Sequence, residues 1–520
     1  MTLPPSTGLI SLRSLFPAAT FLNCSDIEVR EVTSDSRHIS RGCLFAAFPG
    51  KKTDGRDFVP EALRSGAAAI LTHRSLAGLP VPQCIVPDAR RAYGEVCHAL
   101  HFNPSLSLGM VGVTGTNGKT TTTWLVRALL QQLARTCGLL GTIEYHNGHD
   151  SQPANLTTPG APTLAQWLGS MVARQTGYAA LELSSHALDQ DRPAGLSLDV
   201  AVITNITHDH LDYHQHTEHY AAAKARIVEY LKPGGRLIIN ADDPGCQRLL
   251  LRLDIQQADT LTFGLKSPAS LRAKIVDESL DGTVFHLKSE TESLEIHTQL
   301  IGTHNIENIL AAIASVRHFG FSLSEIGAAL PHCAAPPGRL QRVPSRNEAH
   351  VFIDYAHTPD ALTRVVETVR PLCFGRVILV FGAGGDRDAS KRPLMGHAAS
   401  AADVVVITSD NPRTEDPEVI AKQITDGLRQ AATDSENPHI LQFPGTTIEK
   451  RLIVELDRHM AIERAIKLAE PGDVVLIAGK GHEREQLIGR HRFPFDDAAV
   501  AEAALRRVSV PLEFSRCEQG

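Results

Sequence analysis

The chain has 520 residues, of which 42% are hydrophobic and 21% are charged, and its net charge is −7. This composition is typical of a soluble globular protein, and the length exceeds what a single hydrophobic core usually supports. Because the balance is acidic and no long basic run occurs, the sequence argues against nucleic acid or an anionic membrane as a partner.

Cysteine usage and the N-terminus bear on where the protein is found. The nine cysteines form no Cys-x-x-Cys pair and no regular framework, which is typical of reduced thiols. No apolar run approaches the ~18 residues of a membrane span. Pro4 and Pro5 stand where a signal peptide carries basic residues. We therefore expect a cytoplasmic protein with no membrane span.

Turn residues divide the chain into three expected domains, 1–105, 106–335 and 336–520, with breaks at Asn103–Ser105 and Cys333–Gly338. In the second and third, strand-like runs alternate with helical patterns, which predicts an α/β fold with mostly parallel sheets. The strands expected to be buried are 108–113, 178–183, 200–204, 236–240, 351–354, 377–381, 404–408 and 474–478. Ligands of open α/β sheets bind at the carboxyl ends of strands, so motifs that follow these runs gain weight.

A glycine-rich run at 112–123 lies between an expected strand and a helical pattern at 124–130. Such a turn aims backbone N–H groups and the positive end of a helix at a polyphosphate. Lys119 is expected to reach the terminal phosphates, and Thr120 to present its hydroxyl to Mg²⁺. The strict pattern has glycine where this chain has Val113, so the loop is a variant. We predict that it binds ATP.

Carboxylate and imidazole groups follow two neighbouring expected strands, at Glu182 and at His210. An oxygen-rich site for a divalent ion is expected beside a phosphate loop, so we predict Mg²⁺ with these two residues as ligands. The alternative is a zinc site built from His208, His210 and His214.

Several polar residues keep two interpretations. Asp209 and Asp212 suit a metal-site turn or helix caps. Lys224 lies on an expected helix and is a surface lysine unless that helix faces the same cleft. Asn305, near the start of another expected helix, is either a contact to a base or a helix cap.

Four motifs follow the strands of the third domain. They are Asp354–Asp360, Gly382–Asp388, Asp410–Arg413 and Gly479–Glu483. Together they would bring Arg387, Arg413 and Glu483 to one end of a sheet. Two guanidinium groups and a carboxylate suit a zwitterionic amino acid, since arginine pairs with carboxylates and glutamate accepts from an ammonium. The alternative is a set of surface ion pairs that contribute little.

Taken together, the motifs resemble those of the Mur ligase family and occur in the same order. The resemblance extends from Asp35–Arg37 to Gly479–Glu483, and rests on Gly115–Thr121, Glu182–Ser185, Asp209–Asp212, Asp354–Asp360, Gly384–Asp388 and Asp410–Arg413. It implies an N-terminal UDP-binding domain, a central P-loop-type ATPase domain with a parallel sheet, and a C-terminal Rossmann-like domain that brings in an amino acid.

The resemblance also implies a role for individual residues. Those implied to bind ATP are Gly115, Thr116, Asn117, Gly118, Lys119, Thr120, Thr121, Asn305, Arg339 and Asp354. Those implied in catalysis are Lys119, Glu182, His210 and Lys224, with Thr120, Glu182, His210 and a carbamylated Lys224 as the metal ligands.

Substrate contacts are implied in the same way. Those to the uridine-nucleotide substrate are Ser34, Ser36, Lys51, Lys52 and Thr53, and those to its peptidyl and sugar-phosphate portion are Thr157, Thr158, Ser184, Gln190 and Arg192. Those to the amino acid are Arg387, Asp410, Asn411, Pro412, Arg413, Gly479 and Glu483. Leu156 stands where some relatives have asparagine, so that contact is either lost or made by the backbone.

The activity implied by the resemblance is ATP-dependent amide ligation in peptidoglycan precursor synthesis. Through an acyl phosphate, meso-2,6-diaminopimelate would be joined to the D-glutamate of UDP-MurNAc-L-Ala-D-Glu. Within the family, Asp-Asn-Pro-Arg marks enzymes that add diaminopimelate, and Arg413 can pair with the carboxylate that lysine lacks. The alternatives are an L-lysine-adding relative, a folylpolyglutamate synthetase-like ligase, and a nucleotide-dependent regulatory protein. We expect a monomer whose C-terminal domain closes during turnover.

Overall fold

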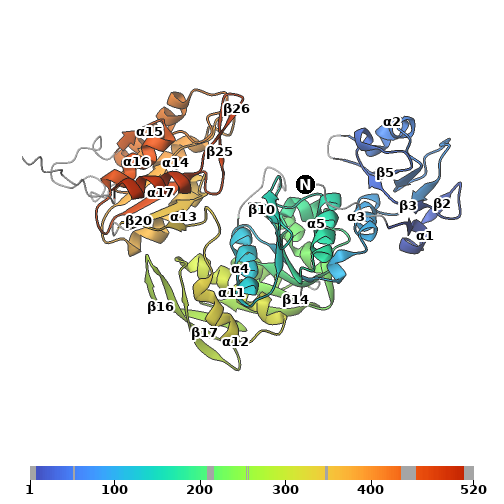
Figure 1. The fold of residues 1–520 in the computed structure, drawn as a ribbon, viewed down its shortest axis with the longest axis horizontal. Helices are drawn as coiled ribbons and strands as arrows, with labels where there is room; N and C mark the ends of the chain where they lie inside the picture. The colour runs from blue at the N-terminus through green and yellow to red at the C-terminus, as the bar shows by residue number, and fades with distance from the viewer. Residues whose placement is uncertain are drawn as a thin grey trace, which may run out of the picture. The chain divides into compact units, whose positions relative to one another are not determined.

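The computed structural model describes residues 8–50, 53–207, 216–252, 255, 257–345, 349–434 and 452–508. The chain divides into two compact units, each with an α/β structure (Figure 1). Unit 1 comprises Met1–Lys274, His286–Ile296 and His304–Cys333, and unit 2 comprises Ile275–Phe285, His297–Thr303 and Ala334–Gly520.

A five-stranded sheet forms the N-terminal part of unit 1, in the order β2-β7-β6-β5-β4. All neighbours run parallel except β2, which is antiparallel to β7. Leu44 and Ala46 of β5 pack with helix α3, whereas Phe45 and Ala47 pack with α2. The two helices therefore cover opposite faces, as the two-residue period of a strand requires. The elements are β2 (Thr20–Leu22), β4 (Val32–Thr33), β5 (Leu44–Ala47), α2 (Val59–Arg64), β6 (Ala69–Thr72), β7 (Gln83–Ile85) and α3 (Ala89–Leu100).

The rest of unit 1 contains a larger sheet in the order β11-β10-β9-β12-β8-β13-β14-β15. The strands from β9 to β15 are parallel, and β10 and β11 are an antiparallel extension. They are β8 (Gly109–Thr114), β9 (Cys137–Leu140), β10 (Glu144–His146), β11 (Ser151–Pro153), β12 (Tyr178–Glu182), β13 (Leu198–Ile203), β14 (Leu231–Asn240) and β15 (Asp259–Gly264). In this parallel sheet the carboxyl ends of β8, β12 and β13 are neighbours.

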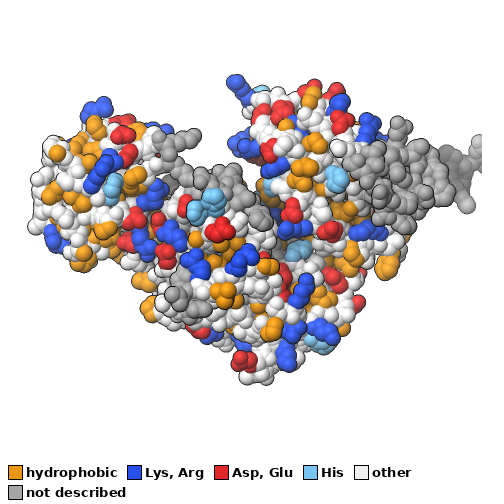
Figure 2. Space-filling view, turned by 180° about the vertical axis from the view of Figure 1, so that it is seen from behind, with side chains coloured by type: hydrophobic (Ala, Val, Ile, Leu, Met, Phe, Trp, Pro, Cys, Tyr) orange, Lys and Arg blue, Asp and Glu red, His pale blue; other side chains and the backbone are white. Residues whose placement is uncertain are grey.

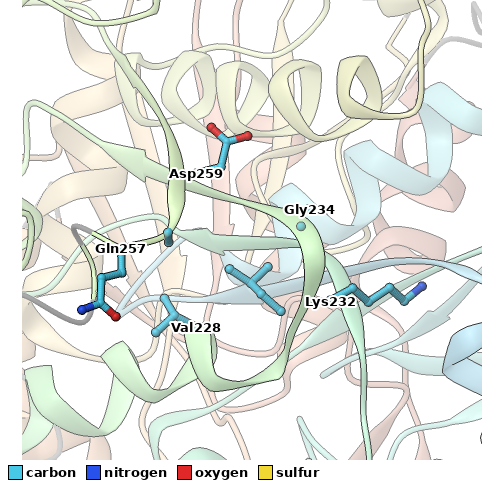
Figure 3. Close-up of a pocket in the computed structure, with 8 residues that line it drawn as sticks. Val228, Lys232, Gly234, Gln257 and Asp259 are labelled. Carbon is cyan, nitrogen blue, oxygen red and sulfur yellow. The ribbon is translucent and has the colours of Figure 1, made fainter.

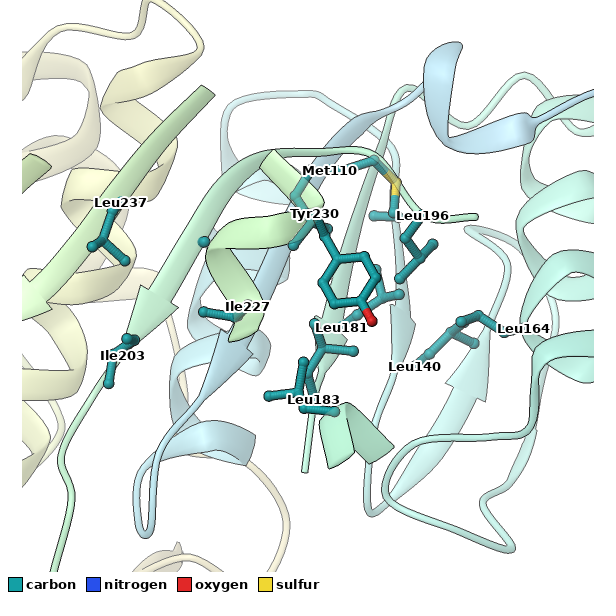
Figure 4. Packing of buried hydrophobic residues seen from close by; sticks show 14 of the residues in the cluster. Met110, Leu140, Leu164, Leu181, Leu183, Leu196, Ile203, Ile227, Tyr230 and Leu237 are labelled. Carbon is teal, nitrogen blue, oxygen red and sulfur yellow. The ribbon is translucent and has the colours of Figure 1, made fainter. Parts of the chain in front are cut away.

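Helices connect these strands. In chain order they are α4 (Lys119–Gln132), α5 (Ala161–Ala173), α6 (Ser185–Asp189), α8 (Thr217–Ala225), α9 (Pro244–Leu249), α11 (Thr303–His318) and α12 (Leu323–Ala329). Leu164, Leu168 and Met171 recur at helical spacing on α5 and are fully buried. They belong to a core in which Leu181 and Ile203 of the sheet are buried together with Ile227 and Tyr230 (Figure 4).

Three strands follow β15, and their residues are divided between the two units. They are β16 (Leu271–Ser279), β17 (Gly282–Lys288) and β18 (Ser293–Thr298). Within unit 1, Leu271 of β16 pairs with Phe263 of β15.

Unit 2 contains a six-stranded sheet in the order β19-β20-β24-β21-β22-β23, parallel except for β19. Leu379 and Phe381 of β21 pack on one side with α13, α14 and α15, while Ile378 and Val380 pack on the other with α16 and α17. Helices therefore cover both faces, as in a doubly wound fold.

The elements of this sheet and its helices have the following bounds. They are β19 (Gln341–Val343), β20 (His350–Asp354), α13 (Pro359–Val369), β21 (Val377–Phe381), α14 (Lys391–Ala399), β22 (Val404–Ile407), α15 (Pro417–Asp434), β23 (Leu452–Val454), α16 (Arg458–Leu468), β24 (Val474–Ala478) and α17 (Asp497–Val508). A hairpin of β25 (Glu485–Ile488) and β26 (His491–Pro494) forms a separate two-stranded sheet.

All eight strands expected from the sequence are confirmed, and the α/β fold class with them. The bounds of β21 and β24 match the expected ranges, because each is a run of five buried apolar residues. The largest difference is at β14, which begins at Leu231 instead of residue 236. The Pro-Gly-Gly run at 233–235 is typical of a turn, but here it lies within the strand.

Acidic and basic side chains are interspersed on the face shown in Figure 2. Within the part of the chain that the structure describes, no helix combines the length and apolarity needed to cross a membrane.

Candidate active site

The phosphate loop connects β8 to α4, and two glycines set its conformation. Gly115 has a φ of +148° and Gly118 a φ of +84°, values that side-chain-bearing residues rarely adopt. A Cβ at Gly115 would lie 1.9 Å from Thr204 Oγ1, and one at Gly118 would lie 2.2 Å from Asn308 Oδ1. The loop is therefore held against the end of β13 and against α11 in a form that only glycine permits.

Residues after β13 fix the rest of the loop. The Asn117 N–H donates to Asn205 Oδ1 at 2.8 Å, and Thr204 Oγ1 donates to the Asn117 carbonyl at 2.6 Å. Thr116 accepts from the Thr207 N–H and from the Tyr220 hydroxyl, at 3.0 and 3.1 Å. These bonds fix the loop in front of α4, which begins at Lys119. The amino end of α4 therefore lies next to the loop, as in an anion-binding site.

Two lysines converge on this loop. Lys119 Nζ donates to the carbonyl oxygens of Gly115 and Thr116 at 2.8 and 2.9 Å. Lys224, on α8, is 1% exposed, and its Nζ donates to the same Gly115 oxygen at 2.7 Å. Lys224 is thus not a surface lysine, and its helix faces the phosphate loop.

Glu182 ends β12 and is 2% exposed. Its carboxylate accepts from Thr120 Oγ1 at 3.0 Å and from the Thr142 N–H and hydroxyl at 2.8 and 2.9 Å. The predicted pair of Thr120 and Glu182 is therefore brought together. Its oxygen atoms are of the kind that Mg²⁺ prefers. His210, with the alternative residues His208, His214, Asp209 and Asp212, lies outside the described residues.

Several predicted substrate contacts form a connected network beside Glu182. Thr157 Oγ1 lies 3.1 Å from Thr142 Oγ1, and Thr158 Oγ1 donates to the Glu182 carbonyl at 2.7 Å. The Ser184 N–H donates to Thr158 Oγ1 at 3.0 Å. Arg192 donates to the Thr158 carbonyl at 3.1 Å and to Gln190 Oε1 at 2.9 Å.

Leu156, beside these threonines, is half exposed, but its backbone is already engaged. The Tyr145 hydroxyl donates to the Leu156 carbonyl at 2.6 Å and accepts from the Leu156 N–H at 3.1 Å. A single buried tyrosine therefore occupies both backbone groups at this position.

The predicted uridine contacts lie in the N-terminal sheet region. Ser36 Oγ donates to Glu61 Oε2 at 2.9 Å, Ser34 hydrogen-bonds with Tyr93, and Thr53 is exposed. Lys51 and Lys52 lie outside the described residues. Ser34 and Ser36 follow β4, at the carboxyl end of a strand in a parallel sheet.

Asn305 is the third residue of α11 and is buried, so it does not occupy the position before the helix. Asn308, one turn later, donates to Asn305 Oδ1 at 3.4 Å and accepts from the Thr122 hydroxyl at 3.4 Å. Asn305 is therefore linked through Asn308 to the helix that follows the phosphate loop.

In unit 2, Asp354 ends β20. Its carboxylate accepts from the N–H groups of Leu340 and Ala356 at 2.7 and 2.8 Å. Burial raises the pKa of Asp354 above its ordinary value, and the nearby Arg339 opposes this effect. The Arg339 guanidinium lies 4.9 Å from the centre of the Tyr355 ring.

Arg387, Arg413 and Glu483 lie at the carboxyl end of the unit 2 sheet. A Cβ at Gly384 would lie 3.0 Å from Arg413 Nη1 and 3.6 Å from Arg387 Cγ, so both arginines flank this glycine. Burial alone would raise the pKa of Glu483, but Lys480 and Asn411 hold the pKa below its ordinary value. The structure thus keeps a carboxylate ionised near two arginine-bearing loops.

The neighbouring motif residues are engaged internally. Asn411 Oδ1 accepts from Lys480 Nζ and the Leu487 N–H at 3.1 and 3.0 Å, and its Nδ2 donates to Glu483 at 2.9 Å. Lys480 is fully buried. Gly479 has a φ of +113°, and a Cβ there would lie 2.7 Å from Asp410 Oδ2. Pro412 is buried, and burial raises the pKa of Asp410 despite Arg458 and Lys480.

Some residues of these sites escape sequence-based prediction. Thr142 lies in a loop of no recognisable motif. Arg458 and Lys480 are buried charges, and each has a partner from a distant segment, Asp497 and Asn411 respectively. Only the position of Lys480 inside a motif could have drawn attention to it.

One pocket in unit 1 is lined by none of these residues. Lys232 and Asp259 line it, and both are already paired, with Asp199 and Arg236. Its walls come from the 228–235 segment and from residues just before and at the start of β15 (Figure 3). The predicted site residues of unit 1 take no part in this pocket.

Comparison with known proteins gives three consecutive family matches. Residues 28–99 match "Mur ligase family, catalytic domain", residues 113–316 match "Mur ligase middle domain", and residues 338–481 match "Mur ligase, glutamate ligase domain". A UDP-N-acetylmuramoyl-L-alanyl-D-glutamate–2,6-diaminopimelate ligase from Geobacillus kaustophilus is 39% identical over 507 residues, which is 96% of this chain and 99% of the relative. One of the same name from Thermosynechococcus vestitus is 40% identical, covering 94% and 95%.

Solved structures agree with these matches. The structure of a ligase of that same name has a TM-score of 0.70 at 32% identity and covers 97% of this chain and 100% of its own. A folylpolyglutamate synthase from Mycobacterium tuberculosis, complexed with ADP, has a TM-score of 0.58 at 21% identity and covers 81% and 94%. This second likeness shows a shared fold. With relatives at about two-fifths identity along nearly its whole length, and a phosphate loop, buried carboxylate and buried lysine where the motifs require them, the chain belongs to the Mur ligase family.

Proposed function

We propose that the chain is an ATP-dependent ligase that joins meso-2,6-diaminopimelate to the D-glutamate of UDP-MurNAc-L-Ala-D-Glu, a step of peptidoglycan precursor synthesis. Relatives named for this reaction match the chain over almost their full length, which supports the proposal. The observation that carries the choice of amino acid is the pair Arg387 and Arg413 flanking Gly384. Two guanidinium groups suit a substrate with two carboxylates, as diaminopimelate has.

In this proposal the D-glutamyl carboxylate attacks the γ-phosphorus of ATP, which gives an acyl phosphate and releases ADP. The diaminopimelate amine then attacks the acyl carbon, so that an amide forms and inorganic phosphate leaves. Lys119 and the N–H groups of Gly115–Thr121 hold the phosphates, and their positive charge offsets the charge that develops on transfer. Asn305, Arg339 and Asp354 keep their expected roles as contacts to the base and ribose.

The residues around Glu182 fit Mg²⁺, because Thr120 and Glu182 bring hydroxyl and carboxylate oxygens within 3.0 Å. Thr120, Glu182, His210 and a carbamylated Lys224 would hold the ion, which neutralises phosphate charge when bound. Glu182 also has a role of its own, since it fixes Thr120 and Thr142 in the wall of the site.

The remaining residues bind the two substrates. Ser34, Ser36, Lys51, Lys52 and Thr53 would contact the uridine nucleotide. Thr157, Thr158, Ser184, Gln190 and Arg192 would contact its peptidyl and sugar-phosphate portion. The amino-acid site would be formed by Arg387, Asp410, Asn411, Pro412, Arg413, Gly479 and Glu483. Because the side chain of Asn411 is bonded to Lys480 and Glu483, the other residues would make most of the direct contacts with the amino acid.

We further propose that residues 1–105, 106–335 and 336–520 act as three domains in a cytoplasmic monomer. ATP and UDP-linked sugars are the substrates expected there.

A phosphate-release assay tests the proposal. Phosphate and ADP should form only when ATP, UDP-MurNAc-L-Ala-D-Glu and diaminopimelate are all present. L-lysine in place of diaminopimelate should be much less effective. Faster turnover with lysine would overturn the assignment of the amino acid, and ATP hydrolysis independent of both substrates would overturn the ligase assignment.

A further inference from the structure

The two arginines assigned to the amino-acid substrate come from different loops. Arg387 lies in the turn after β21, and Arg413 lies in the turn after β22. Parallel strands place both turns at the same edge of the sheet, but strand pairing alone does not set the distance between two long side chains. Something else must fix one loop against the other.

A set of hydrogen bonds connects the two loops directly. The Gly385 N–H donates to the Asn411 carbonyl at 2.9 Å, and Arg413 Nη1 donates to the Gly385 carbonyl at 2.7 Å. The N–H and hydroxyl of Thr414 donate to the Asp386 carboxylate at 3.2 and 2.7 Å. The backbone of each loop is therefore bonded to the other.

Both loops also hold a non-glycine residue in the left-handed region. Asp386 and Arg413 each have a φ of 52°. Residues with a Cβ adopt this conformation only where the surrounding contacts determine it. The strained residues are themselves partners in the bonds between the loops, so losing those bonds would release the conformation that aims Arg413.

Glu415 lies behind this junction. Its carboxylate accepts from the Asp386 N–H at 2.5 Å and from both Nη atoms of Arg392 at 2.8 Å. Arg392, on α14, is 2% exposed and also donates to the Gly384 carbonyl at 3.2 Å and to Gln423 at 2.8 Å. One ion pair, between buried Arg392 and partly exposed Glu415, thus reaches both loops and helix α15.

We propose that Glu415 and Arg392 are positioning residues that set the spacing of Arg387 and Arg413 for the amino-acid substrate. This inference rests on the proposed function, which takes the two arginines as the groups that bind the substrate carboxylates. Neither Glu415 nor Arg392 needs to touch the substrate. Their pairing neutralises the buried guanidinium of Arg392. Because the contact is bidentate, it also fixes the orientation of Glu415 and so the position of the loop that carries it.

The test is steady-state kinetics of the full chain with Glu415→Gln. The KM for diaminopimelate should rise about tenfold, whereas the KM values for ATP and the uridine nucleotide stay within about twofold. The preference for diaminopimelate over lysine should fall, because a misplaced Arg413 no longer distinguishes them. Arg392→Lys keeps the charge but loses the two-pronged contact, and it should shift the same quantities in the same direction.

Asp473→Asn is the matched control. Asp473 is likewise a carboxylate paired with an arginine, Arg376, at 2.7 Å, but it lies before β24, at the amino end of the strands of the same sheet. This variant should lower the unfolding temperature without changing either the KM for diaminopimelate or the preference over lysine. The inference is overturned if Asp473→Asn raises that KM as much as Glu415→Gln does, or if Glu415→Gln and Arg392→Lys both leave it unchanged.

Arg413→Ala separates this inference from the proposed function. If Arg413→Ala leaves the KM for diaminopimelate unchanged, the assignment of the amino-acid site is wrong. If it raises that KM while Glu415→Gln and Arg392→Lys do not, the site stands and only the positioning role is wrong.

Discussion

Lys119 and Lys224 share one acceptor: their Nζ atoms donate to the Gly115 carbonyl oxygen at 2.8 and 2.7 Å. Two ammonium groups this close repel each other. Carbamylation of Lys224 would replace one positive charge by a negative one and turn that repulsion into attraction. The proposed modification is therefore consistent with the surroundings of Lys224.

Lys224→Ala should lower the rate of phosphate release at least about 100-fold, the usual loss when a group that stabilises the reacting centre is removed. Short carboxylic acids added to the variant should restore part of the rate, because they can replace a carbamate. Rescue by small amines instead would show that the unmodified ammonium is the active form.

Glu182→Gln should raise the Mg²⁺ concentration needed for half-maximal activity at least about tenfold, because a neutral amide is a weaker ligand than a carboxylate. The measurement is a Mg²⁺ titration of phosphate release. Glu144→Gln is the control, since Glu144 pairs with Arg127 at 2.7 Å on a nearby strand and has no assigned role in the site. An equal shift in both variants would contradict the metal assignment.

Arg413→Leu should reduce kcat/KM for diaminopimelate about 100-fold, because the substrate's extra carboxylate would lose its partner. The value for lysine should change little, so the preference between the two should narrow. Competition between the amino acids in one reaction measures this ratio. Arg484→Leu, at an 83% exposed arginine of the same unit, should leave the ratio unchanged.

His98 should make unit 1 less stable in acid. Burial lowers the pKa of His98 from 6.5 to about 3, and neither ring nitrogen has a hydrogen-bond partner among the described residues. Between these two pKa values the unfolded chain binds a proton that the folded chain does not. The contribution of neutral His98 to the free energy of unfolding is therefore fully present above pH 6.5. Between pH 6.5 and about 3 it falls by about 1.4 kcal/mol per pH unit.

His98→Phe should make the free energy of unfolding less dependent on pH in this range, because unfolding would take up about one proton fewer. Urea unfolding followed by tryptophan fluorescence reports on unit 1, because Trp124 and Trp167 are the two tryptophans of the chain. The exposed His38→Phe is the control. A steep acid dependence that survives His98→Phe would assign the effect to other groups.

Local pattern was enough to predict the eight buried strands, and to place Thr120 and Glu182 at one site. Buried apolar runs such as Val377–Phe381 have few alternatives to a central strand, and parallel strands place the residues that follow them at one edge. The phosphate loop needs its glycines and its lysine in one short segment, so the sequence contains the whole feature.

The partners of polar side chains were not predictable in this way. Asn411 belongs to a motif expected to bind substrate, yet its amide is bonded to Lys480, Glu483 and Leu487. Lys480 and Glu483 belong to another motif about 70 residues along the chain, and Leu487 lies in a hairpin outside every motif. Which of several polar partners a side chain takes depends on how distant segments approach, and no local pattern encodes that.

The engagement of Asn411 also bears on chemical ageing. Asparagine side chains deamidate when the next backbone nitrogen attacks the amide, and proline at 412 has no N–H to do so. Had the change occurred, an aspartate would face Glu483 without the amide N–H that now joins them, and the ammonium of Lys480 would be shared between two carboxylates. The Asn-Pro order therefore protects, for the life of the protein, a contact that a single spontaneous reaction would turn from attraction into repulsion.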